Sequence, residues 1–122
     1  MSDARAYRWD DLPKDFPLDK IERRRIIGDN MMISEVRLQQ GCFVPMHAHE
    51  NEQIAMVVHG RLRFGVTGAD GTTTDIEAGA GEVVHLPSNV PHSAEALEES
   101  LVLDLFSPPS EGTGIDQLGA EG

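Results

Sequence analysis

Residues 41–53 read GCFVPMHAHENEQ and contain two histidines, His47 and His49, separated by a single residue. Residues two apart on a β-strand point to the same face of the sheet, so a strand here would present the two imidazoles side by side. Gln53 follows after three intervening residues and can add an amide oxygen. The stretch therefore predicts a chelating group of side chains on a β-strand.

A second stretch, GEVVHLPSNVPH over residues 81–92, supplies a third imidazole shortly after the turn that Pro87 fixes. A lone histidine is usually a surface or satisfied core residue, and a His-x-His pair also arises by chance. The combination of four donors at fitting intervals favours metal binding over that interpretation. Three imidazole nitrogens and one amide oxygen suit zinc, nickel, iron, manganese, cobalt or copper. The predicted ligands of one divalent transition-metal ion are His47, His49, Gln53 and His92.

Short apolar segments separated by turn residues make up most of the chain. Their composition and alternation predict strands at residues 25–27, 31–38, 54–58, 62–66, 72–76, 82–86 and 101–106. Strands at intervals of roughly eight to twelve residues are typical of an all-β sandwich or barrel. Only residues 10–24 could hold a short helix, and Pro13 and Pro17 interrupt that segment.

These segments resemble the cupin family. Residues 41–60 are similar to its first motif, a glycine, five residues, His-x-His, three or four residues, an acid, six residues and a glycine. Residues 81–92 are similar to its second motif, a glycine, five residues, proline, one residue, glycine, two residues and histidine. The resemblance covers residues 26–108 and implies an all-β fold, a single cupin barrel of the double-stranded β-helix or jelly-roll type.

Two positions depart from the cupin pattern. Asn89 replaces the glycine of the second motif, a mild change because asparagine tolerates the left-handed backbone. Gln53 replaces a common glutamate, so all the protein ligands would be neutral and a bound metal ion would keep its full charge as a Lewis acid. The expected organisation is an N-terminal arm over residues 1–24, the barrel over 25–108 and a flexible acidic tail over 109–122.

A narrower resemblance involves the sequence His-x-His-x-x-Glu-Gln and residues 103–108, LDLFSP. Both are similar to the pectin-degradation cupins, which convert unsaturated uronates into a linear keto form. The resemblance implies metal binding by the four predicted ligands and a pocket lined by Asp104 and Phe106, the predicted catalytic residues. Alternation alone also places Asp104, the only charge within residues 101–106, on one face with Val102 and Phe106.

The resemblance to the uronate group fails at one position. That group typically carries an arginine soon after the Ser-Pro or Thr-Pro, suited to hold a substrate carboxylate. Residues 109–112 of this chain contain no basic side chain. Arg37, Arg61 or Arg63 could substitute from neighbouring strands, whereas residues 23–25, three consecutive arginines, are expected to form a solvated face without a binding role.

Three functional classes follow from the predicted site. The first is a metal-dependent enzyme that rearranges a small oxygenated molecule, such as an unsaturated sugar acid, by isomerisation or ring opening. In it Asp104 moves a proton and Phe106 shapes the pocket wall. The second is a metal-dependent dioxygenase, which needs a redox-active ion. The third is a non-enzymatic module that binds a small molecule.

Composition limits the partners and the compartment. The chain has 122 residues and a formal net charge of −11, which fits one domain and argues against nucleic acid or an anionic membrane as a partner. No apolar run approaches the length of a membrane helix, and the single cysteine excludes an intrachain disulfide. A cytoplasmic protein that binds a small-molecule substrate is expected. The arm that precedes the barrel, with Tyr7 and Trp9, suggests a homodimer.

Overall fold

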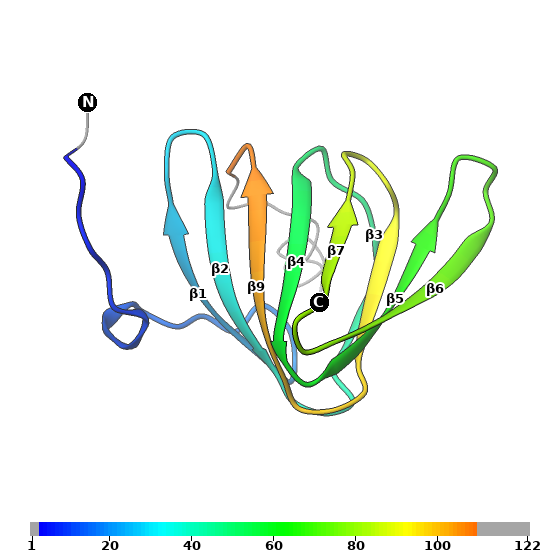
Figure 1. The fold of residues 1–122 in the computed structure, drawn as a ribbon, viewed down its shortest axis with the longest axis horizontal. Helices are drawn as coiled ribbons and strands as arrows, with labels where there is room; N and C mark the ends of the chain where they lie inside the picture. Colours follow the sequence, from blue (N-terminus) through cyan, green and yellow to red (C-terminus); the bar gives the residue numbers. More distant parts are fainter. Residues whose placement is uncertain (1–2, 110–122) are drawn as a thin grey trace.

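Two antiparallel β-sheets form the molecule in a computed structural model that describes residues 3–109 (Figure 1). A five-stranded sheet has the order β1-β2-β9-β4-β7, and a four-stranded sheet has the order β3-β8-β5-β6. In chain order the strands are β1 (Ile21–Ile27), β2 (Met32–Leu38), β3 (Phe43–His47), β4 (Glu52–His59), β5 (Arg61–Thr67), β6 (Thr73–Gly79), β7 (Val83–Leu86), β8 (His92–Ala96) and β9 (Ser100–Ser107). The predicted all-β jelly-roll fold is confirmed.

The core lies between the two sheets. Alternation along β4 and β5 places every second side chain inward, as in the burial of Ala55 and Val57 on β4 and of Leu62 and Phe64 on β5. The buried core cluster comprises Ile21, Val36, Leu38, Cys42, Ala55, Val57, Leu62, Phe64, Ala78, Val84, Leu86, Ala96 and Val102. Both sheets contribute to it, so burial of these side chains holds one sheet against the other.

Two tight turns use a left-handed backbone. Gly60, between β4 and β5, has φ of 93°, and a Cβ there would lie 2.6 Å from the Cα of Ser100. Only glycine avoids that overlap. Asn89, which replaces the second motif's glycine, has φ of 65°, so the asparagine adopts the backbone expected of it.

The observed elements differ from the predicted ones at three places. β1 begins at Ile21, four residues before the predicted strand, and the segment predicted as a possible helix contains only a 3-10 turn at Trp9–Asp11. That turn lies outside the barrel, beyond β1 (Figure 1). β8 was not predicted from the sequence. The expected acidic tail lies, from residue 110 onward, outside the described residues.

No helix among residues 3–109 is long and apolar enough to cross a membrane.

Candidate metal centre

Three histidines meet on the inner side of the four-stranded sheet. His47 is the last residue of β3 and lies opposite His92, the first residue of β8, in the antiparallel register. His49 lies in the loop between β3 and β4, so the prediction that His47 and His49 share a strand face is wrong in its geometry. The loop brings His49 inward instead, held by the hydrogen bond from the Asn89 amide to the His49 carbonyl at 2.8 Å.

Each of the three imidazoles makes a hydrogen bond from Nδ1 to a backbone carbonyl. His47 contacts the oxygen of Pro45, His49 that of Asn51 and His92 that of Val90, each at 2.9 Å. Because a carbonyl only accepts, Nδ1 carries the proton in all three rings and Nε2 keeps its lone pair. The potential ligand atoms of the three residues lie within 4.8 Å of one another, so the triad could bind a metal ion.

Burial favours the neutral form of two of the imidazoles, His92 and His47. Burial is the main cause that lowers the pKa of His92, to about 4, and repulsion from His47 and His49 adds to the shift. Burial also lowers the pKa of His47, with a smaller contribution from His49. Neutral imidazole is the form that ligates metal ions, so the lowered pKa values of His47 and His92 favour the ligating form of both rings.

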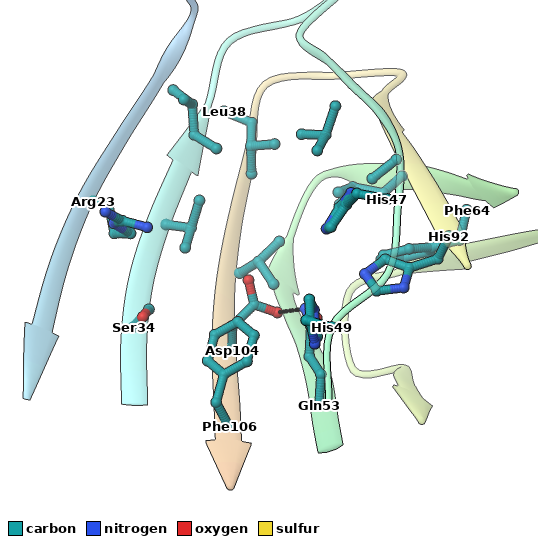
Figure 2. Close-up of a pocket in the computed structure, with 16 residues that line it drawn as sticks. Arg23, Ser34, Leu38, His47, His49, Gln53, Phe64, His92, Asp104 and Phe106 are labelled. Atoms are coloured by element: carbon teal, nitrogen blue, oxygen red, sulfur yellow. Dashed lines mark hydrogen bonds between the residues drawn. The ribbon is translucent and has the colours of Figure 1, made fainter. Parts of the chain in front are cut away.

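Gln53 lies beside the histidines on β4 and is buried, with 7% of its surface exposed (Figure 2). Its amide Nε2 donates to Oδ1 of Asp104 at 2.9 Å. An ionised carboxylate only accepts, so this contact fixes which end of the amide faces Asp104 and leaves the amide oxygen as the end that could ligate a metal ion.

Asp104 and Phe106 are both on the inward face of β9, together with Val102, as alternation predicted. Burial raises the pKa of Asp104 to about 6, although the hydrogen bond from Gln53 and the charge of Arg23 oppose the shift. The Phe106 ring contacts the His49 ring edge-on, with ring centroids 5.8 Å apart. The two predicted catalytic residues thus adjoin the predicted ligands.

A cavity of about 70 Å³ lies between these side chains and the opposite wall of the barrel. Such a volume accommodates several water molecules or a small organic molecule. The lining residues are Ile21, Arg23, Ser34, Val36, Leu38, Val44, His47, His49, Gln53, Leu62, Phe64, His92, Ala94, Val102, Asp104 and Phe106. The cavity has apolar walls with a few polar groups, the usual composition of a small-molecule site.

The arginines proposed from the sequence do not line this cavity. Each forms an ion pair with a glutamate. The distances from the guanidinium nitrogen to the carboxylate oxygen are 3.8 Å for Arg37–Glu35, 3.7 Å for Arg61–Glu77 and 2.7 Å for Arg63–Glu95. All three side chains are 41–47% exposed. They form surface ion pairs, not a group for binding a ligand in the barrel.

Arg23 lines the cavity, although the sequence placed it on a solvated face. Only 6% of the surface of Arg23 is exposed. Ile21, two residues earlier on the same strand, is similarly buried, with 5% exposed. Arg23 was missed because β1 was predicted to begin at Arg25. Extending the strand to Ile21 would have placed Arg23 two residues from a buried isoleucine and therefore on the inward face. Ser34, another lining residue, was also missed.

Comparison with known proteins supports the assignment of the fold. A cupin domain model matches residues 34–106. The structure of KdgF from Halomonas sp. superposes with a TM-score of 0.74 at 28% sequence identity, covering 84% of this chain and 93% of that one. A cupin from Shewanella frigidimarina described as RmlC-like superposes with a TM-score of 0.75 at 22% identity, covering 90% and 95% of the two chains.

Oxalate decarboxylase from Bacillus subtilis is similar in both sequence and structure. The sequence of OxdC is 30% identical over 73 residues, which are 60% of this chain. A structure of the Bacillus subtilis enzyme, described for its Mn(II) centres, superposes with a TM-score of 0.79 at 22% identity over 88% of this chain. This chain spans about a fifth of the length of that curated relative, 19%, so the likeness is to one part of a larger protein.

Proposed function

Since the chain belongs to the cupin domain family, we propose that it is a metal-dependent enzyme that rearranges a small oxygenated molecule, by isomerisation or ring opening of an unsaturated sugar acid. The observation that carries the proposal is the contact between Gln53 and Asp104 beside the histidine triad. It joins a ligand-type side chain to an acid-base group within one cavity. The similarity of the motifs to the pectin-degradation cupins supports the substrate class.

The donor set fits a divalent transition-metal ion. The Nε2 atoms of His47, His49 and His92 and the amide oxygen of Gln53 would hold it, because backbone carbonyls fix the three tautomers and Asp104 fixes the amide. Bound there, such an ion would supply Lewis acidity toward a carbonyl or hydroxyl oxygen of the substrate.

Asp104 is the proton-transfer group in this proposal. Opening the ring of an unsaturated uronate removes the proton of the anomeric hydroxyl and forms a carbonyl at the anomeric carbon. The bond from that carbon to the ring oxygen breaks, and the ring oxygen leaves as an enolate. A proton then adds to the carbon of the former double bond, so the product is an isomer and needs no oxidant. A carboxylate held in a cavity can perform both transfers. The hydrogen bond from Gln53 fixes its position, and Phe106 lines the same cavity.

Metal content tests the first half of the proposal. Elemental analysis of the purified protein is expected to show one divalent ion per chain, and His49→Ala should lose it because one of three imidazoles is removed. His85→Ala is the matched control, since His85 is exposed and its Nε2 contacts Glu52 at 2.6 Å instead of the cavity. Metal that persists in His49→Ala would contradict the assigned site. A protein without metal, purified under conditions that retain it, would favour a non-enzymatic binding module.

Asp104→Asn tests the second half. Turnover of an unsaturated uronate, followed by the loss of ultraviolet absorbance of its double bond, should fall by about a hundredfold or more. Metal content should be unchanged, because the asparagine oxygen can still accept from Gln53. Asp75→Asn, an exposed acid on β6, should retain full activity. Full activity of Asp104→Asn would contradict the role of Asp104, and oxygen consumption with the substrate would support a dioxygenase instead.

A further inference from the structure

Arg23 is a buried cation on the side of the cavity opposite the histidines. Figure 2 shows Arg23 beside β1 and the triad on the other side, with Asp104 between them. The proposed proton transfer does not use Arg23, nor does the proposed metal site. A charged side chain that is only 6% exposed needs electrostatic compensation to remain in the interior, and Asp15 contributes to it.

Asp15 holds the Arg23 guanidinium in a fixed orientation. Nε of Arg23 donates to Oδ1 of Asp15 at 3.0 Å and Nη2 donates to Oδ2 at 2.8 Å. The backbones of the two residues are also paired. The Asp15 amide donates to the Arg23 carbonyl at 2.8 Å, and the Arg23 amide donates to the Asp15 carbonyl at 2.9 Å. A bidentate arrangement of this kind sets the plane of the guanidinium as well as its position, which prepares it to recognise a planar anion.

Ser34 adds an unsatisfied hydroxyl to the same wall. Ser34 lies on β2, opposite Asp104 on β9 in the register, and is 1% exposed. Its Oγ lines the cavity and has no hydrogen-bond partner within the described part of the chain. Leaving a buried hydroxyl without a partner costs free energy, and a ligand in the cavity that accepts a hydrogen bond would remove that cost.

The charge balance of the cavity favours an anionic ligand. Among the described lining residues other than the histidines, Arg23 and Asp104 carry formal charges, and the charge of Arg23 is already paired with that of Asp15. A divalent ion at the proposed metal site would leave the cavity with an excess of positive charge, which a carboxylate in it would reduce. A neutral ligand would leave that excess in a largely apolar enclosure.

We propose that Arg23 and Ser34 form a carboxylate-binding subsite. It orients a small hydroxy acid so that the end carrying the hydroxyl group points toward the histidine triad. The subsite deepens the proposed function, on which it rests, by assigning the residues that select an acid over a neutral sugar. Arg23 binds the carboxylate by charge-assisted hydrogen bonds and Ser34 donates its hydroxyl to it. Arg23 takes the role that the sequence sought in Arg37, Arg61 or Arg63.

The test compares the binding of glycerate and glycerol, which differ in a carboxylate and are small enough for the cavity. Neither contains the double bond of the proposed substrate, so binding is measured without turnover, by calorimetry and ligand-observed NMR. Wild-type protein should bind glycerate more tightly than glycerol. Arg23→Gln should weaken glycerate binding by about tenfold to a hundredfold, and Ser34→Ala by a few-fold, with little change for glycerol.

Arg25→Gln is the matched control. Arg25 lies on the same strand and its Nη2 also donates to Asp15, at 3.2 Å, but it is not among the lining residues. It should bind glycerate as the wild type does. An equal loss in Arg25→Gln, or wild-type affinity in Arg23→Gln, would overturn the subsite. If Arg23→Gln does not fold, Ser34→Ala decides, because it removes a hydroxyl that has no partner in the described structure.

The outcome separates this subsite from the reaction proposed above. Metal content is measured for every variant, and Arg23→Gln should retain the metal of the wild type. Selective glycerate binding that depends on Arg23 supports the subsite even if no unsaturated uronate is turned over. Turnover with an unchanged KM in Arg23→Gln would support the reaction and contradict the subsite.

Discussion

Each histidine of the triad uses its Nδ1 for a carbonyl two residues away in the chain, before or after it. The partners are backbone atoms, so no substitution of a neighbouring side chain removes them directly. The backbone conformation at Pro45 in β3, and at Asn51 and Val90 in the loops, therefore decides the tautomer of the three histidines. At this scale the site is a property of local backbone geometry, to which the cavity side chains Gln53 and Asp104 add the polar contacts.

Asp15 provides a prediction about pH at the scale of a single residue. Burial by itself would raise the pKa of Asp15, but hydrogen bonding to Arg23 and attraction to Arg23 and Arg25 outweigh it, so the pKa lies below the ordinary value of 3.8. A lowered folded pKa stabilises the fold above the unfolded pKa, and that stabilisation is lost as the pH falls through the folded pKa.

Asp15→Asn should therefore be less stable than the wild type at neutral pH, with the difference shrinking below about pH 4. Denaturant unfolding of both proteins at neutral and acidic pH measures this. Asp29→Asn, in the exposed turn after β1, provides the comparison for removing a carboxylate elsewhere. A difference between Asp15→Asn and wild type that stayed constant across that range would rule out the ionic contribution of Asp15.

At the scale of elements, the turn between β4 and β5 lies very close to Ser100, where β9 begins. Gly60 and Gly71 both have positive φ, 93° and 82°, but only Gly60 has neighbours that a Cβ would overlap, since nothing lies within 4 Å at Gly71. Gly71→Ala should cost about 1 kcal/mol for the backbone alone. Gly60→Ala should cost about 2–4 kcal/mol, because the β9 end must also move.

Urea unfolding measures the free energy of unfolding of both variants. The extra destabilisation of Gly60→Ala over Gly71→Ala is the cost of the close approach between Gly60 and Ser100. Equal costs at the two positions would mean that the backbone conformation, not the contact with Ser100, constrains Gly60.

The sequence predicted the strands that carry β-branched residues in alternation, and the structure brings the residues predicted as ligands close to Asp104 and Phe106. β8 was missed because its sequence, HSAEA, contains no β-branched or aromatic residue, and it is a strand through pairing with β3 and β5. The position of His49 in a loop, and the inward face of Arg23, depend on where β3 ends and β1 begins. Strand ends are set by tertiary pairing, which a single sequence does not encode locally.

At the scale of the whole molecule, the outer face of the five-stranded sheet carries an apolar patch over β9, β4 and β7. Register places Met56 between Leu103 on β9 and Val83 on β7, and Ile54 beside Leu105 in the adjacent row. Met56 and Val83 are 39% and 55% exposed. Large contiguous apolar patches are uncommon on monomers, and an apolar patch is where two copies of a chain with a net charge of −11 would repel least.

We therefore expect a homodimer that pairs this face with its equivalent on a second copy, as a two-fold axis requires. Met56→Glu should shift the mass measured by light scattering from dimer to monomer, since it buries two like charges at the interface. Ile76→Glu, on β6 of the other sheet and 41% exposed, should remain dimeric. A wild-type protein that is monomeric at high concentration and high salt would contradict this arrangement.

The backbone pairing of Asp15 with Arg23 has a consequence for communication across the molecule. It attaches the segment that precedes β1 to a residue of the cavity wall. Coupling between two binding events is thermodynamically reciprocal, so a ligand that holds Arg23 in place also tightens the attachment of that segment. Conversely, a partner that draws the segment away from β1 would lower the affinity of the cavity for its ligand. With the proposed subsite occupied, the cavity ligand and the N-terminal segment would thus be linked through a single arginine.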